Sequence, residues 1–322
     1  MRSAKGRRRI LFLLGLALIQ ALLFSAVRAA AEDPAEPLSE AAQLAAETDA
    51  AIAALKSITL RSEDQILAAR AMYDELPEEA KAMVTNRDVL EKAEEKLWSL
   101  KDRDTASRVK KLTDSGKHDE AIALAEEYLP GHDTGGQVML QLLRACSRKA
   151  GAMIRAEEYE RADRYLQECR ERYAGEDMSA IDSAGRSLER AIAEPESGSL
   201  LVSRAKGEYG TVRIRTGDAP ALVKLVSMSD PDRCLTVYVR AGESAAVHVG
   251  DGTYALRYAT GARWYGEKEL FGSSTRCLSV DTVLRFSTDR TGSDVYYQNY
   301  EIVLHSVDSQ ARGTTLMEIG EF

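Results

Sequence analysis

The sequence contains no recognisable arrangement of the residues that carry out catalysis. Nucleophilic catalysis needs a hydroxyl or thiol, a base and an orienting acid held together. The sequence has no G-x-S-x-G turn and no phosphate-binding glycine loop. Its histidines fall in two turns of a helical region and at two polar positions of predicted strands, namely His118, His132, His248 and His305. We therefore predict no catalytic residues and a protein that is not an enzyme; an enzyme of unrecognised type is an alternative.

Metal binding is not indicated either. Two His-Asp pairs start helices or lie in loops, and adjacent residues there point apart: His118 with Asp119, and His132 with Asp133. Asp119 is better explained as an acid near a helix N-terminus. A hairpin loop with Asp289, Ser293 and Asp294 around Gly292 could hold calcium loosely, but a turn with Asx hydrogen bonds is the favoured interpretation. We predict no metal and no cofactor.

Two groups of side chains are candidates for binding a partner. The first is an aromatic segment in which glycines bracket a Trp–Tyr pair, made of Tyr258, Arg263, Trp264 and Tyr265. Partly exposed rings of this kind could stack on sugars or a peptide; the alternative is that they close one end of a β-sheet core. The second group would line a groove between helices and contact a peptide, or lie on solvated helix faces: Arg144, Arg148, Tyr159 and Tyr165.

The first 31 residues have the pattern of an export signal. Three arginines, residues 7–9, precede an apolar run from Ile10 to Val27, and alanines follow at 29–31. This order is typical of a secretory signal peptide. The alternative is an uncleaved anchor, since about 18 apolar residues can just span a bilayer. We predict an extracytoplasmic protein, secreted or anchored in the membrane by this segment.

The charge outside that segment is acidic. Of 43 basic and 51 acidic residues, six basic ones and no acidic one fall in the first 31, which leaves a net charge of −14 on the remainder. An acidic body repels nucleic acid and anionic lipid headgroups, so both are poor candidate partners. The oligomeric state is not indicated.

Four cysteines fall as one pair in each half of the chain. On the oxidising side of a membrane, disulfides are permitted. The economical pairing is Cys146 with Cys169 and Cys234 with Cys277, although buried free thiols are an equal alternative.

The N-terminal half is predicted to be helical. Residues 32–103 read as a bundle of short helices, with a serine at position 62 that could cap a helix and Pro77 at a helix start. The order of elements over about residues 49–101 resembles a helical module of Gram-positive bacterial surface proteins, which implies a spacer or interaction module. The residues that carry this resemblance are Ile58–Ile66, Ala69–Pro77, Val84–Asn86 and Leu90–Glu94.

Residues 104–194 have a different pattern, in which a turn and a small alanine precede each second helix. Gly116 with Ala121, and Tyr159 with Ala162, match the tetratricopeptide pattern, so this segment resembles tetratricopeptide hairpins. The resemblance implies a binding scaffold. Residues 195–206 read as a linker because they begin Pro-Glu-Ser-Gly-Ser.

From residue 207 onward the apolar period changes from 3.6 to 2. Alternating strands are predicted around Val212–Ile214, Val223–Leu225, Leu235–Val239, Ala245–Val249, Tyr254–Tyr258, Val283–Phe286 and Tyr300–Leu304. Such spacing predicts an antiparallel β-sandwich over residues 207–322. The segment from Gly242 to Gly272 resembles a C-terminal β-domain of uncharacterised bacterial proteins, which implies an accessory role.

The predicted fold class is therefore α + β, with a helical bundle and tetratricopeptide-like hairpins before a β-sandwich. We expect a non-enzymatic binding or scaffolding protein of the bacterial cell envelope, with protein or cell-wall glycan as the partner. A passive spacer that presents the β-domain is the alternative.

Overall fold

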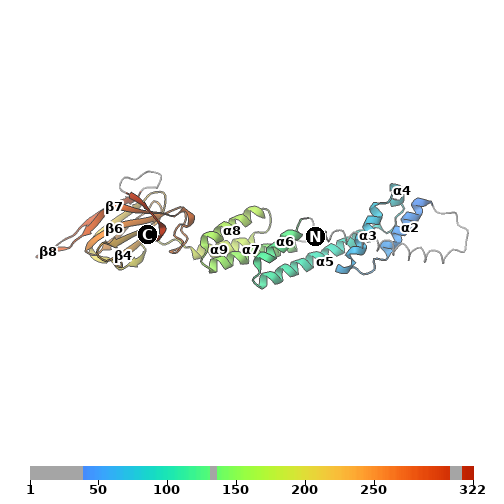
Figure 1. Cartoon of the computed structure of the whole chain (residues 1–322), viewed down its shortest axis with the longest axis horizontal. Coiled ribbons are helices and arrows are strands. Elements are labelled where there is room, and N and C mark those ends of the chain that lie inside the picture. Colours follow the sequence, from blue (N-terminus) through green and yellow to red (C-terminus); the bar gives the residue numbers. More distant parts are fainter. Residues whose placement is uncertain (1–38, 131–135, 305–313) are drawn as a thin grey trace, which may run out of the picture. The chain divides into compact units, whose positions relative to one another are not determined.

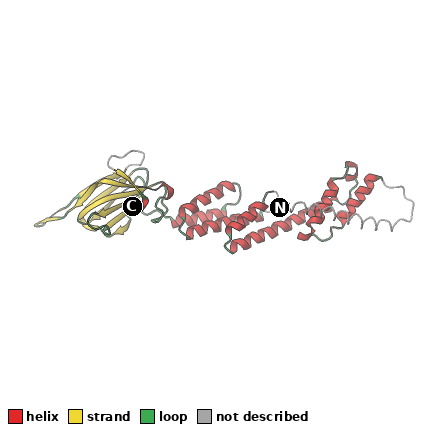
Figure 2. Ribbon diagram, in the orientation of Figure 1, coloured by secondary structure: helices red, strands yellow, loops and turns green. Residues whose placement is uncertain are grey.

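A computed structural model describes residues 39–130, 136–304 and 314–322 (Figure 1). The predicted export segment, 1–31, lies outside these residues, as do His132 and His305. The chain divides into two compact units, Met1–Lys101 and Asp102–Phe322. Helices fill the N-terminal half and strands the C-terminal part (Figure 2), so the predicted α + β class is confirmed.

The first unit is a small helical core. It contains α2 (Glu40–Ala53), the 3-10 turn η1 (Leu60–Ser62), α3 (Glu63–Asp74), α4 (Glu78–Lys81) and the start of α5 (Arg87–Asp114). Most of the apolar positions whose spacing predicted these helices are buried together, among them Ile66, Leu90 and Leu97, and Ile52 of α2 joins them. Pro77 stands directly before α4, as its missing N–H favours.

Ser62 does not cap α3 as the sequence pattern suggested. Its hydroxyl accepts a hydrogen bond from the backbone N–H of Thr59 at 3.1 Å and donates one to the carbonyl of Ser57 at 3.1 Å. The side chain is therefore engaged by the 3-10 turn that precedes the helix and is not available to its first N–H groups.

Asp49 of α2 satisfies the backbone that enters α5. Its carboxylate accepts hydrogen bonds from the backbone N–H groups of Thr85 and Asn86, each at 3.0 Å, and from the Thr85 hydroxyl at 2.7 Å. Burial alone would raise the pKa of Asp49, but these hydrogen bonds outweigh it and lower the pKa below its ordinary value. The contact connects two helices that are far apart in sequence.

Replacing Asp49 by alanine is expected to destabilise the first unit by about 1–3 kcal/mol, because two backbone donors lose their acceptor. The lowered folded-state pKa sets the pH dependence. The contribution of Asp49 is complete above its unfolded-state pKa of about 3.9 and is lost as the pH falls through the folded-state value. Unfolding by urea at pH 7 and at acid pH measures both. A mutant as stable as the parent at pH 7 would contradict this role.

Helix α5 is continuous where the sequence pattern suggested two helices. It runs from Arg87 to Asp114 without a break near residues 101–104. The reason is compositional: the segment contains no glycine and no proline, and its residues are mostly good helix formers. The boundary between the two units falls inside this helix, after Lys101.

Four further helices pack against one another in the second unit. They are α6 (His118–Tyr128), α7 (Gln137–Arg155), α8 (Tyr159–Arg172) and α9 (Ser179–Ala191), and α7 contacts the other three. Small residues at the contacts, Ala121, Ala125 and Ala162, are fully buried. Gly116 has a φ of +80°, which its lack of a Cβ allows, and so ends α5.

The strands form two sheets around one hydrophobic cluster. The six-stranded sheet has the order β1-β4-β3-β6-β7-β11, and a three-stranded sheet has the order β10-β2-β5. The strands are β1 (Leu200–Ser203), β2 (Lys206–Thr216), β3 (Ala221–Ser227), β4 (Cys234–Val239), β5 (Ser244–Val249), β6 (Gly252–Thr260), β7 (Arg276–Phe286), β10 (Asn299–Leu304) and β11 (Thr314–Met317). Val212, Val223, Val237 and Leu256 are among the buried residues that both sheets contribute.

Every predicted strand lies within one of these elements, but two details differ. β10 pairs with β2 in parallel, because Asn299 lies opposite Thr211 and Leu304 opposite Thr216; the other pairs are antiparallel. In the segment 195–206 that we predicted to be a linker, the apolar run at Leu200–Ser203 forms β1 beside β4.

A third, two-stranded sheet is the hairpin of β8 (Asp289–Thr291) and β9 (Asp294–Tyr296). Its turn is Gly292-Ser293, and Gly292 has a φ of +64°. The predicted hairpin loop is therefore confirmed. Figures 1 and 2 show this hairpin extending beyond the strands of the two larger sheets.

Candidate functional site

Trp264 of the predicted aromatic segment lies in the interior. Its side chain is 6% exposed and contacts Tyr238 edge-on, with ring centroids 5.0 Å apart, and Phe271 at 5.5 Å. Tyr258, on β6, is also buried, in the cluster between the two sheets. The stacking surface expected from Tyr258 and Trp264 is thus not presented to solvent. Tyr258 is part of the core that both sheets share, whereas Trp264 belongs to a second buried cluster with Tyr238 and Phe271.

Tyr265 and Arg263 join the aromatic segment to helices α8 and α9. The Tyr265 hydroxyl donates a hydrogen bond to Asp163 of α8 at 2.8 Å. Arg263 pairs with Asp163 at 3.4 Å and with Glu189 of α9 at 2.5 Å. Tyr265 itself packs with the helical cluster. Burial and the Asp163 hydrogen bond raise the pKa of Tyr265 to about 12, so its hydroxyl stays protonated at neutral pH.

The first turn of α8 adds further contacts to those of Asp163, Arg263 and Tyr265. We call these contacts between the helices and the β-domain the joint. The backbone N–H of Glu160, a donor without a partner inside the helix, donates to the Glu269 carboxylate at 2.9 Å. The Glu160 carboxylate in turn accepts a hydrogen bond from the backbone N–H of Ser273 at 2.9 Å. Hydrogen bonds from the Ser273 side chain and backbone lower the pKa of this carboxylate. Gly272, with a φ of +60°, lets the carboxylate approach, since a Cβ there would lie 2.6 Å from the Glu160 carboxyl carbon.

These contacts show what Arg263, Trp264 and Tyr265 do in the fold. Arg263 and Tyr265 connect the β-domain to α8 and α9, whereas Trp264 packs within the β-domain. Arg263 is only partly buried, but both of its ion pairs are made within the chain, so a partner would have to compete with Asp163 and Glu189 for its guanidinium.

The predicted helical groove does not bring its four residues together. Arg144 and Arg148 are exposed on α7, whereas Tyr159 lies at the joint, where its ring would be 3.7 Å from a Cβ on Gly266. Tyr165 contacts Lys149, whose Nζ lies 4.7 Å from the ring centroid. Among the described residues its buried hydroxyl has no hydrogen-bond partner.

Cys146 of α7 and Cys169 of α8 are buried neighbours in the helical cluster. Both thiols are free in this structure. Their contact raises the pKa of Cys146, which burial raises further, while the same contact lowers the pKa of Cys169 to about 7. Burial raises the pKa of the nearby Tyr165 hydroxyl. The positions are compatible with the pairing predicted from the sequence.

Cys234 and Cys277, in contrast, lie too far apart for the predicted disulfide. Cys277 is level with Tyr238 across the sheet, through Ala259 and Leu222, whereas Cys234 is four residues farther along β4. Three strand spacings separate them by about 14 Å across the sheet and four residues add about 13 Å along it. A disulfide requires Cα atoms within about 7 Å. The distance excludes this pairing. The prediction was wrong because the order of the strands could not be deduced from the sequence.

Exposed tyrosines gather instead at the β8–β9 hairpin. The rings of Tyr209 and Tyr297 have centroids 6.0 Å apart, and Tyr297 is 45% exposed. The Arg290 guanidinium lies 5.6 Å from the Tyr209 ring centroid and donates to the Tyr209 hydroxyl at 3.2 Å. We call Tyr209, Arg290 and Tyr297 the tyrosine platform.

A bulge in β2 places Tyr209 in this position. The pairing of β2 with β5 is interrupted between Lys206 and Thr211. Gly207 and Gly210 permit it, since a Cβ on Gly207 would lie 2.5 Å from the backbone of Gly250 and one on Gly210 would lie 2.6 Å from the Phe286 ring. Bulges redirect side chains and are common beside functional sites.

The hairpin strands place the other two members on the same face. Arg290 lies opposite Val295, so alternation turns Tyr296, the last residue of β9, to the other face. Tyr297 directly follows the strand and, like Arg290, lies beside the Tyr209 ring. The base of the hairpin is held by hydrogen bonds from Thr288 to Asp251, at 2.8 Å, and from the Ser287 backbone to Gln298, at 2.5 Å. The platform is thus supported by polar contacts at its root.

The tyrosine platform was not among the binding residues predicted from the sequence. The signal that could have found it is the Gly-Glu-Tyr-Gly sequence at 207–210, because two glycines inside a strand pattern indicate a bulge. The Tyr296-Tyr297 pair beyond a Gly292 turn was a second signal. The sequence pattern did not indicate that Tyr209 and Tyr297, about 90 residues apart in the chain, lie side by side.

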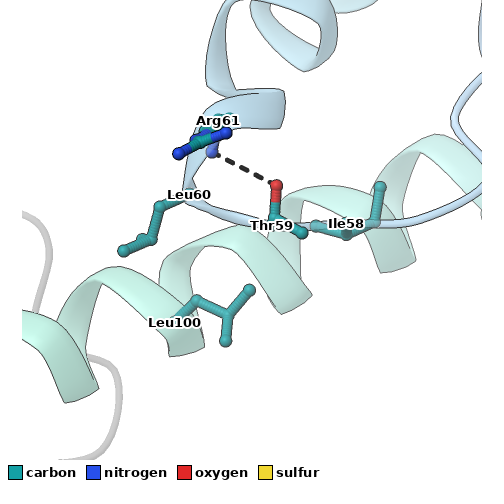
Figure 3. A pocket seen from close by; sticks show the side chains of 5 residues that line it. All are labelled: Ile58, Thr59, Leu60, Arg61 and Leu100. Carbon is teal, nitrogen blue, oxygen red and sulfur yellow. Dashed lines mark hydrogen bonds between the residues drawn. The ribbon is translucent and has the colours of Figure 1, made fainter.

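A shallow hollow of about 580 Å³ lies in the first unit, lined by Ile58, Thr59, Leu60, Arg61 and Leu100 (Figure 3). Leu60 is 43% exposed there.

In the described part of the chain, no group of three or more His, Cys, Asp or Glu side chains is arranged to hold a metal ion. Within the same residues, no helix is long and apolar enough to cross a membrane.

Comparisons with models of protein families, with curated proteins and with solved structures found no match to this chain.

Proposed function

We propose that this chain is a non-enzymatic binding or scaffolding protein on the extracytoplasmic side of a bacterial envelope, and that its β-domain contacts the partner through the tyrosine platform. The observation that carries the proposal is the exposed Tyr297 ring beside the half-buried Tyr209, with Arg290 against the Tyr209 ring. Aromatic and arginine side chains contribute most of the binding energy at many protein surfaces. The basic and apolar leader supports the location.

The rest of the second unit supports this surface. We propose that the two sheets with their shared core are a β-sandwich and that helices α6–α9 are tetratricopeptide-like hairpins. The joint at Asp163, Arg263 and Tyr265 connects the two. A scaffold of this kind would hold the tyrosine platform at the end of the β-domain that carries the β8–β9 hairpin.

Binding of the full chain to envelope fractions tests the proposal. We expect saturable binding that Tyr297→Ala weakens at least about tenfold, equal to about 1.4 kcal/mol, because one stacking surface is lost. Tyr296→Ala is the matched control: Tyr296 is the neighbouring residue, 60% exposed, on the opposite face of the hairpin. Its binding should stay at the level of the parent.

Two outcomes would overturn the platform as the binding surface. Loss of binding in an Arg144→Ala, Arg148→Ala double mutant with Tyr297→Ala unaffected would place the partner on α7. Absence of saturable binding to every envelope fraction would favour a passive spacer.

A further inference from the structure

The charges around the tyrosine platform are of both signs. Residues 206–211 carry one basic and one acidic side chain, and residues 289–297 carry one basic and two acidic ones: Lys206, Glu208, Arg290, Asp289 and Asp294. The remainder of the chain after residue 31 is acidic as a whole. A strongly acidic partner is steered to a basic surface, and this surface is not basic, so such a partner is disfavoured here. A neutral partner meets no electrostatic repulsion.

The hydrogen-bonding groups of the platform suit a partner rich in hydroxyls. Among the described residues, the Arg290 guanidinium donates one hydrogen bond, to Tyr209, and has no carboxylate partner. A guanidinium has five N–H donors, so further donors are available beside the rings. A phenolic hydroxyl both donates and accepts. Tyr297 therefore adds a second polar group at the edge of an apolar face.

The ring faces suit a flat ligand of small width. Tyr297 is 45% exposed, and its ring is inclined by 36° to that of Tyr209. Protein hot spots are usually central and surrounded by contacts that exclude water. The exposed aromatic area here is small, because Tyr209 on β2 is only partly exposed beside Tyr297. A sugar ring can cover one aromatic face with its C–H groups and direct its hydroxyls to the polar groups beside it.

We infer that the partner of the tyrosine platform is a neutral glycan chain, whose sugars stack on Tyr297 and Tyr209 and hydrogen-bond to Arg290. This inference rests on the proposed function and specifies the partner at the same surface. A protein partner is the principal alternative, and the experiment below separates the two.

The test uses the full chain and two envelope preparations. One is the polysaccharide left after exhaustive protease treatment, divided by an anion-exchange resin into unretained neutral and retained acidic fractions. The other is the detergent-extracted protein. We expect saturable binding to the neutral fraction that changes little between about 50 and about 500 mM salt, because salt screens attraction between charges and a neutral glycan carries none. Periodate oxidation of the glycan diols should abolish it.

Variants locate the site. Tyr297→Ala should weaken binding to the neutral fraction at least about tenfold, while Tyr297→Phe, which keeps the ring, should stay within about threefold. Arg290→Ala should also weaken it, because the donors beside the ring are lost. Tyr296→Ala should bind like the parent, and all four variants are checked for parental circular dichroism.

The outcomes distinguish the two claims. Binding that depends on Tyr297 but is confined to the protein extract overturns the glycan inference and leaves the proposed function intact. Binding confined to the acidic fraction overturns the assignment of a neutral glycan. Absence of binding to any preparation overturns the proposed function itself.

Discussion

Replacing Trp264 by alanine is expected to lower the free energy of unfolding of the second unit by about 3–5 kcal/mol. The ring is 6% exposed and packs against Tyr238 and Phe271 in a buried cluster that is separate from the core shared by the two sheets. Edge-to-face contacts add to the burial of its area. Its removal leaves a cavity that the surrounding sheet fills only in part. Urea unfolding followed by circular dichroism measures the loss.

The comparison with Tyr296→Ala makes this result specific. Tyr296 is also aromatic and lies in the same unit, but it is 60% exposed, so its removal should change the free energy of unfolding by about 0.5 kcal/mol or less. A Trp264→Ala chain that is as stable as the parent, yet no longer binds envelope fractions, would show that Trp264 is a contact residue after all. Any binding lost by an unfolded variant says nothing about the site, which is why stability is measured first.

Oxidation of Cys146 and Cys169 to a disulfide is expected to stabilise the second unit by about 3 kcal/mol, since the bond would close a loop of about 24 residues in the unfolded chain. Two thiols lose two protons and two electrons to an external oxidant, such as a thiol oxidase or a small disulfide. Because contact with Cys146 lowers the pKa of Cys169 below its ordinary value, the rate of reaction should rise with pH as thiolate forms, and should do so at a lower pH than for an ordinary cysteine.

Alkylation of the unfolded chain before and after reduction, followed by mass spectrometry, detects this bond. The protein from its native compartment should show Cys146 joined to Cys169, and Cys234 and Cys277 not joined to each other. A Cys146→Ala, Cys169→Ala double mutant should be insensitive to reductant in urea unfolding. Recovery of four free thiols from the exported protein would contradict the expectation and leave the pair as buried thiols.

Periodicity in the sequence predicted the elements well because each depends on local contacts. The alternation at Leu235–Val239 and Tyr254–Tyr258 gives β4 and β6, and the helical spacing of Ile66, Ala69 and Tyr73 gives the buried face of α3. It did not predict the parallel pairing of β10 with β2, because register between distant strands depends on the whole fold. The Cys234–Cys277 pairing failed for the same reason.

The binding surface was harder to predict, because ring exposure depends on tertiary contacts. Trp264 and Tyr265, bracketed by glycines, have the composition of a recognition loop, but Asp163 and Glu189 on the helices bind the segment. Tyr209, in an apparently ordinary strand, is redirected by a bulge toward Tyr297. Only the exposed fractions of these side chains distinguish a core ring from a surface ring.

Amide hydrogen exchange of the full chain, with and without the neutral envelope glycan, tests the central claim most directly. If the tyrosine platform binds the glycan, exchange should slow in peptides covering 206–211 and 289–298, while peptides covering 261–275 should exchange at the same rate in both samples. Slower exchange confined to 261–275 or to α7, with 289–298 unchanged, would contradict the account.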